Sequence, residues 1–199
     1  MLRSLATVLT FSVFAVAPVH AASPGQVAPD FTLTATDGKA VKLADHKGKW
    51  VVLEWVNPGC PYVQKHYDSH NMQGLQKEFS GRQVVWLAVN STKPGHPDYL
   101  KPADMQGWMK DKAGVPHATL MDEKGVAGRA YDARTTPHMY IVNPEGKLAY
   151  AGAIDDKRSY NPNDVKTAKN FVRVALNEAL AGKAVTTAST TPYGCSVKY

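Results

Sequence analysis

Hydrophobic and polar positions along this chain fall into blocks with strand-like or helix-like spacing. Residues 50–56 and 84–89 are apolar at nearly every position, which is typical of central strands covered on both faces. Shorter alternating or apolar runs predict further strands at residues 29–34, 40–43, 119–121, 139–142 and 148–151. The first two of these form a predicted N-terminal β-hairpin. The order of strands and helices favours an α/β fold with a layered sheet.

Helical spacing follows several of these strands. It predicts helices at residues 61–81, 103–113, 124–131 and 161–182. The first has an interruption near His70, where the apolar spacing slips. The last begins at Asn161-Pro162, a cap residue followed by proline, and stops at Gly182. Residues 183–199 are rich in Thr, Ala and Ser without periodicity, so we predict a flexible C-terminal arm.

The first 21 residues have the pattern of an export signal. Arg3 is followed by an apolar run at residues 5–19 and by a small-residue cleavage site ending at Ala21. The run is short for a membrane span, and an uncleaved anchor is the alternative. We therefore expect a periplasmic or secreted domain at residues 25–182, with no stable membrane insertion after cleavage.

Composition limits the function. Of the 199 residues, 44% are hydrophobic and 20% are charged, which is ordinary for one soluble domain. The net charge of +6 is scattered, without a basic stripe, so we expect no nucleic-acid partner. A nucleotide fingerprint is absent from the sequence, and we expect no cofactor.

Cys60 is one of only two cysteines, and it lies where a predicted strand gives way to a helix. Free N–H groups and the helix dipole stabilise a thiolate at a helix N-terminus. Pro61 suits the first helical position, where no N–H is needed. We expect the preceding Asn57-Pro58-Gly59 turn to expose the thiol, which favours a reactive cysteine over a buried structural one.

Two further features surround this cysteine in the sequence. Glu54 is the one carboxylate in a strand that otherwise looks buried, and a buried carboxylate must be paired or protonated. It is a candidate proton acceptor for Cys60, directly or through a water molecule. The alternatives are a partner such as Lys49 or a wetter strand face. Thr136-Pro137 directly precedes a strand, where a proline can be cis although the cis form is uncommon overall.

These features resemble the thioredoxin-like superfamily. Residues 54–63 are similar, without gaps, to the thioredoxin active-site stretch. Glu54 matches the buried acid, Cys60 matches the first cysteine of the C-x-x-C pair, and Val63 replaces the second. Thr136-Pro137 matches the cis-proline element that faces the thiol. The resemblance implies a mixed central sheet flanked by helices.

The flanking segments indicate a branch of this superfamily. Residues 27–33 resemble the start of the redoxin, or alkyl hydroperoxide reductase/thiol-specific antioxidant, branch. Residues 194–198 resemble the ending of a peroxiredoxin-like group with a single cysteine at the thioredoxin position. The usual peroxiredoxin threonine and proline positions hold Asn57 and Leu53 here. With Val63 in place of a cysteine, the local dithiol cycle of thioredoxin is unavailable.

The resemblance implies a thiol oxidoreductase with Cys60 as nucleophile. The residues expected to form its substrate groove are Pro61, Tyr62, Thr136, Pro137 and His138. Its substrates would be protein disulfides or hydroperoxides, and an external thiol reductant would supply the electrons. A rival hypothesis is a non-catalytic thioredoxin-fold module that binds a partner or acts as a metal or thiol chaperone.

Cys195 is the only cysteine that could resolve an intermediate on Cys60. The 13 residues from Gly182 to Cys195 span roughly 40 Å when extended, enough to cross the domain. A static disulfide, an intermolecular bridge and an unrelated thiol are the alternatives. A thiol with one or two imidazoles can hold copper or zinc, but no closely spaced cysteine pair supports a metal site. The histidines considered were His66, His70, His117 and His138.

Overall fold

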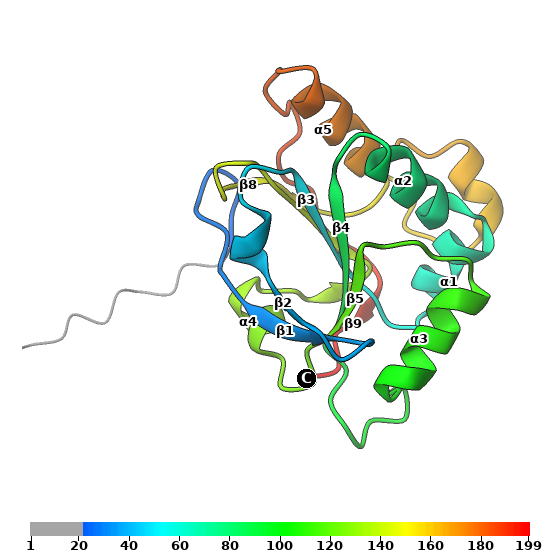
Figure 1. Cartoon of the computed structure of the whole chain (residues 1–199). Coiled ribbons are helices and arrows are strands. Elements are labelled where there is room, and N and C mark those ends of the chain that lie inside the picture. Colours follow the sequence, from blue (N-terminus) through cyan, green and yellow to red (C-terminus); the bar gives the residue numbers. More distant parts are fainter. Residues whose placement is uncertain (1–21) are drawn as a thin grey trace, which may run out of the picture.

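The computed structural model describes residues 22–199, so the predicted export signal lies outside the described residues. Seven strands form one sheet in the order β2-β1-β5-β4-β3-β7-β8 (Figure 1). The strands are β1 (Thr32–Ala35), β2 (Ala40–Lys42), β3 (Val51–Trp55), β4 (Val85–Asn90), β5 (Ala118–Met121), β7 (His138–Val142) and β8 (Leu148–Gly152). The α-helices are α1 (Pro61–Asp68), α2 (Asn71–Ser80), α3 (Pro102–Asp111), α4 (Val126–Ala130) and α5 (Phe171–Leu180). None of the helices in residues 22–199 combines the length and apolar character needed to cross a bilayer.

The sheet is mixed, as predicted. β3, β4 and β5 are parallel neighbours, β7 pairs antiparallel with β3, and β8 pairs antiparallel with β7. The N-terminal β-hairpin of β1 and β2 joins the other edge through an antiparallel pairing with β5. The two apolar runs became the central strands β3 and β4, and both are buried along their whole length. The predicted fold class is therefore confirmed.

Helices cover the two faces of the sheet unequally. Apolar side chains of α1, α2, α3 and α5 pack on one face, and α4 packs with the N-terminal segment on the other (Figure 1). Because side chains alternate along a strand, β3 contributes Val52 to the first face and Leu53 and Trp55 to the second. The side chains that pack around Cys60 therefore lie on the face of the sheet that α1 covers.

Two helix predictions had different outcomes. The predicted interruption is present, because His70 adopts a left-handed conformation (φ 58°) between α1 and α2. The single helix predicted at residues 161–182 is wrong: a short 3₁₀ helix at Pro162–Lys166 precedes α5. The chain leaves helical geometry because the Phe171 N–H donates to the Ile154 carbonyl and Asn170 caps α5 through the Arg173 N–H.

Residues 183–199 do not form the flexible arm that we predicted. They lie along the domain, and we call them the C-terminal arm. β9 (Cys195–Ser196) pairs antiparallel with β6 (Thr135–Thr136), and the Val197 N–H donates to the Arg134 carbonyl. At the end of the chain, the Tyr199 hydroxyl donates to the Ala133 carbonyl at 2.7 Å. The composition of the arm did not indicate these contacts, because most of them are made by backbone groups.

Candidate active site

Cys60 is the N-cap residue of α1, and Pro61 occupies the first turn as predicted. The turn before it is held by Asn57, whose side chain accepts from the Gly59 N–H at 2.7 Å. The Asn57 amide also donates to Thr92 and Asp98, at 3.3 and 3.4 Å. The loop after β4 therefore fixes the turn that carries the cysteine. The sequence placed Asn57 in a turn before Cys60, but it gave no sign of the contacts with Thr92 and Asp98.

The Cys60 thiol is buried, with 1% of the residue exposed, whereas we expected the turn to expose it. Its Sγ atom lies 3.0 Å from the Thr136 carbonyl oxygen and 2.7 Å from Sγ of Cys195. Both cysteines are free thiols in the structure. The cover is supplied by the C-terminal arm, because β9 places Cys195 opposite Thr136 in the β6–β9 pairing.

The Cys195 thiol is held in its protonated form by its surroundings. Burial is the main cause that raises its pKa to about 12, followed by a hydrogen bond to Cys60 and the charge of a Cys60 thiolate. The Asp98 carboxylate acts in the same direction, while Lys198 opposes it. The two Sγ atoms lie within hydrogen-bonding distance, and the surroundings of Cys195 keep its thiol protonated.

Glu54 is buried beneath α1 and α2, as its position in β3 predicted. Its carboxylate accepts hydrogen bonds from the following donors: the Tyr67 hydroxyl at 2.8 Å, Trp86 Nε1 at 2.8 Å and Gln76 Nε2 at 3.2 Å. Burial raises the pKa of Glu54 to about 7, and these hydrogen bonds offset part of the increase. The carboxyl group can therefore gain or lose a proton near neutral pH. The partners are aromatic and amide groups rather than Lys49.

The expected groove residues are only partly brought together. The Thr136-Pro137 bond is cis, as predicted, and the Thr136 carbonyl faces the Cys60 thiol. Pro61 is exposed beside it, and the Tyr62 ring packs edge-on against Tyr193 of the arm. The His138 side chain lies apart from them.

His138 is paired with Trp55 across β3 and β7, on the α4 face of the sheet. Its Nδ1 atom lies 3.3 Å from the Arg134 N–H and 3.1 Å from the Tyr140 hydroxyl. Burial lowers the pKa of His138 to about 4, so the ring is neutral at neutral pH. These contacts hold the loop before the cis proline.

The histidines considered as metal ligands are not gathered in one place. His66 lies against Asn71 and Tyr193, whereas His117 packs edge-on against His46. Within residues 22–199, no three His, Cys, Asp or Glu side chains converge as a set of metal ligands.

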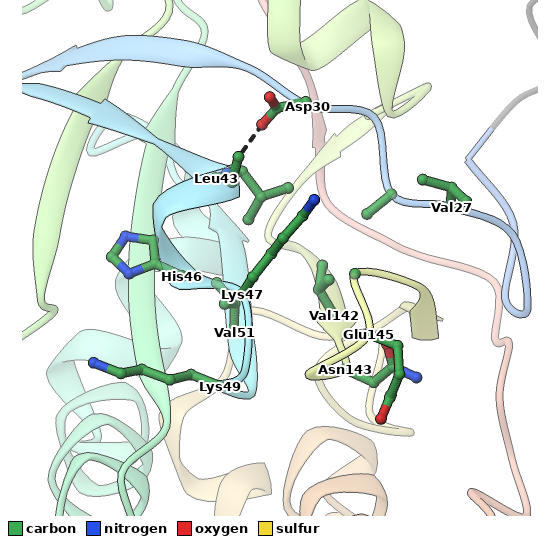
Figure 2. A pocket seen from close by; sticks show the side chains of 13 residues that line it. Val27, Asp30, Leu43, His46, Lys47, Lys49, Val51, Val142, Asn143 and Glu145 are labelled. Carbon is green, nitrogen blue, oxygen red and sulfur yellow. Dashed lines mark hydrogen bonds between the residues drawn. The ribbon is translucent and has the colours of Figure 1, made fainter.

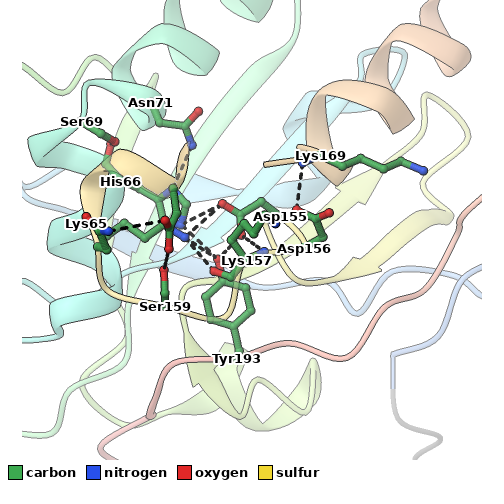
Figure 3. Close-up of polar contacts among 12 residues, drawn as sticks. Lys65, His66, Ser69, Asn71, Asp155, Asp156, Lys157, Ser159, Lys169 and Tyr193 are labelled. Carbon is green, nitrogen blue, oxygen red and sulfur yellow. Dashed lines mark hydrogen bonds and ion pairs between the residues drawn. The ribbon is translucent and has the colours of Figure 1, made fainter. Parts of the chain in front are cut away.

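A buried polar cluster near Cys60 was not predicted. It consists of Lys65, His66, Asp155 and Tyr193, all at most 4% exposed (Figure 3). Lys65 Nζ lies 3.3 Å from the Asp155 carboxylate and donates to the Lys157 carbonyl at 2.7 Å. In the sequence, Lys65 and His66 lie between Val63 and Tyr67, whose spacing indicated the buried face of α1. That apolar spacing gave no reason to expect that the lysine and the histidine are buried as well.

A surface hollow of about 350 Å³ lies at the other end of β3 (Figure 2). Its lining includes Val51, Val142, Lys47, Lys49 and Glu145. Asp30 beside it accepts from the Ala44 N–H at 3.1 Å. This hollow is separated from Cys60 by the length of the strand, so it is not part of the candidate active site.

The sheet order and the thiol that faces a cis proline place the chain in the class of thioredoxin-like folds. Residues 24–151 match the AhpC/TSA family, and the chain belongs to this family. A crystal structure of an uncharacterised conserved protein from Geobacillus kaustophilus has a TM-score of 0.77 and 29% identity, covering 88% of this chain and 92% of that protein. A putative thiol:disulfide interchange protein DsbE from Chlorobium tepidum shares the fold, with a TM-score of 0.61 and 21% identity over 80% of this chain and 99% of its own.

Two curated relatives from Bacillus subtilis differ in their named chemistry. Thiol-disulfide oxidoreductase ResA is 29% identical over 126 residues, which are 63% of this chain and 65% of ResA. Peroxiredoxin Bcp is 31% identical over 113 residues, covering 54% of this chain and 62% of Bcp. The chain thus spans slightly less than two thirds of the length of each relative. The predicted family and superfamily are confirmed.

Proposed function

We propose that the chain is a thiol-dependent oxidoreductase in which Cys60 is the nucleophile and Cys195 resolves its intermediate. The observation that carries the proposal is the 2.7 Å separation of the two Sγ atoms. A disulfide bond measures about 2.05 Å, so a small shift of both side chains suffices to join them. Cys195 thereby supplies the second thiol that Val63 cannot provide.

The preferred substrate is a protein disulfide. The Cys60 thiolate attacks one substrate sulfur, forming a mixed disulfide and releasing the other sulfur as a thiolate. Once Cys60 is bonded, its negative charge no longer raises the pKa of Cys195, so Cys195 ionises more readily. Cys195 then attacks Cys60 Sγ, and the second substrate thiolate leaves. The substrate has then been reduced by two electrons, and the protein carries a Cys60–Cys195 disulfide. An external dithiol reductant restores both thiols.

Glu54 is the proposed proton acceptor of this cycle. Its pKa of about 7 lets it take a proton near neutral pH and return it later. The hydrogen bonds of its carboxylate go to Tyr67, Gln76 and Trp86, so transfer to or from Cys60 requires an intervening water molecule.

A hydroperoxide is the second candidate substrate, and the similarity to Peroxiredoxin Bcp supports it. Here the Cys60 thiolate attacks the peroxide oxygen, giving a sulfenic acid and an alcohol or water. Cys195 then forms the disulfide and water leaves. The Asn57 side chain is occupied by Gly59, Thr92 and Asp98, which weighs against the usual peroxiredoxin arrangement. We further propose that the protein works in the periplasm or outside the cell, as its first 21 residues indicate.

The proposed function is tested with the wild type and the Cys60→Ser and Cys195→Ser variants. Each is assayed for insulin reduction and for peroxide consumption, and the oxidised proteins are mapped as non-reduced peptides. We expect a Cys60–Cys195 peptide pair in the wild type and background activity in Cys60→Ser. Cys195→Ser should accumulate a mixed disulfide at Cys60, because its resolving thiol is missing.

Two results would contradict the proposal. Both thiols staying free in oxidised glutathione, or Cys195 joined to another molecule, would exclude the internal resolving step. Equal activity of the wild type and Cys60→Ser in both assays would favour the non-catalytic binding module instead. Activity with peroxide but not with insulin would move the assignment to the second candidate substrate.

A further inference from the structure

The arm is fastened to the domain by the buried polar cluster described above. The Tyr193 hydroxyl donates to the Asp155 carboxylate and lies 3.5 Å from Lys65 Nζ (Figure 3). It also lies 3.3 Å from Nε2 of His66. Asn71 Nδ2 donates to His66 Nδ1 at 2.9 Å, so Nε2 carries the ring hydrogen and donates to the hydroxyl. Every hydrogen-bonding direction of this phenol is therefore used.

The cluster links the helix of the nucleophile to the arm of the resolving thiol. Lys65 and His66 belong to α1, which begins directly after Cys60. Tyr193 precedes Cys195 by two residues, a distance of at most about 7 Å along the chain. Fixing the phenol to α1 therefore restricts where the Cys195 thiol can lie. On its other side, Cys195 is held by the pairing of β9 with β6.

The cluster is costly for the fold unless it is complete. Lys65 and Asp155 are 1% and 2% exposed, and buried charges need further hydrogen bonds to offset their loss of water. If the arm leaves, the Asp155 carboxylate loses the Tyr193 hydroxyl, and Lys65 and His66 lose it as well. Docking of the arm is therefore favoured through a polar group that takes no part in the thiol exchange itself.

We propose that Lys65, His66, Asp155 and Tyr193 form an arm latch that positions Cys195 at Cys60. The latch sets the effective concentration of the resolving thiol, and it closes the site over Cys60 when the arm is docked. The proposal rests on the proposed function, because it concerns the resolving step. Tyr193 is a positioning residue, since its hydroxyl contacts the other three latch residues rather than the sulfur atoms.

A structural role alone would have a different signature. Loss of a structural contact lowers the stability of the fold but leaves the disulfide equilibrium of the native state unchanged. A positioning role changes that equilibrium, because it alters how often Cys195 meets Cys60. The reaction is reduced protein plus oxidised glutathione giving the Cys60–Cys195 disulfide plus two reduced glutathione molecules.

The test uses the full chain with Tyr193→Phe, which keeps the ring and removes the hydroxyl. Tyr160→Phe is the matched control, because Tyr160 is 68% exposed and packs on the same Tyr62 ring. The disulfide equilibrium with glutathione is read by acid quench, alkylation and mass. We expect a decrease of about tenfold or more in the effective concentration for Tyr193→Phe, and less than about twofold for the control.

A second readout does not need the disulfide. In the Cys195→Ser background, we expect Tyr193→Phe to speed alkylation of Cys60 by iodoacetamide at least about threefold, because the undocked arm uncovers the thiol. Unchanged equilibrium and unchanged alkylation, with only a lower urea midpoint, would overturn the latch and leave the proposed function standing. A wild-type protein that never forms the Cys60–Cys195 disulfide would overturn both.

Discussion

A Gly194→Ala variant is expected to lose the docked arm and to lower the effective concentration of Cys195 at Cys60 by roughly 100-fold. The residue adjoins Cys195 and has φ 136°, a conformation that side chains rarely adopt. An added Cβ would lie 2.0 Å from the Thr136 carbonyl oxygen and 2.7 Å from its carbon. Because these are backbone atoms next to the cis proline, the arm must move rather than its neighbour.

The measurement is the glutathione equilibrium of the full chain, together with the alkylation rate of Cys60 in a Cys195→Ser background. Gly107→Ala is the matched control, since this glycine is within α3 and an added Cβ would meet nothing within 4 Å. The control should leave both quantities unchanged. A Gly194→Ala protein with the wild-type equilibrium and the wild-type alkylation rate would show that the close approach to Thr136 does not hold the arm.

The parts of the site that depend on local order could be predicted from the sequence. Glu54 could be recognised as buried because every neighbour in its strand is apolar. Cys60 could be placed at a helix start because a turn and a proline surround it. The cis state of Pro137 followed from its place before a strand and from family resemblance. Each of these signals lies within a few residues of the feature it predicts.

The parts that depend on distant segments could not be predicted. The burial of Lys65 has no local signal, because nothing near it in the sequence indicates that Asp155 and Tyr193 will cover it. The arm lacked apolar periodicity, since Tyr193 is its only aromatic anchor before Cys195 and β9 docks through backbone groups. The reach of the arm allowed Cys195 to meet Cys60 but did not choose between pairing and the alternatives.

The helix error at residues 161–182 has a similar origin. Apolar residues recur at helical spacing through this stretch, so the pattern gave no reason to stop. The break occurs because Asn170 caps a new helix and residues 154–156 bind the backbone of residues 169–171. An asparagine inside a periodic run was the available signal, and it competes for a cap position whenever another segment can satisfy the freed backbone groups.

Glu54→Gln is expected to make the protein more stable at pH 8 and to leave its stability nearly unchanged at pH 4.5. Burial raises the pKa of Glu54 from 4.5 to about 7. Between these values the folded protein binds one more proton than the unfolded chain, so the wild type loses stability as the pH rises. Above pH 7 both states are ionised and the loss is complete, at roughly 3 kcal/mol for this shift.

Glutamine fits the same contacts, because its oxygen can accept from Trp86 and Gln76 while its amide donates to the Tyr67 hydroxyl oxygen. Urea unfolding of reduced wild type and variant at both pH values measures the difference. Glu145→Gln, at an exposed site, is the control and should show no such pH dependence. A Glu54→Gln variant that is less stable than the wild type at pH 8 would contradict this prediction. It would mean that the hydrogen bonds of the ionised carboxylate outweigh the cost of its burial. If Glu54 also takes the proton from Cys60, the variant will reduce insulin more slowly despite its greater stability, which separates the cost of the buried acid from its use.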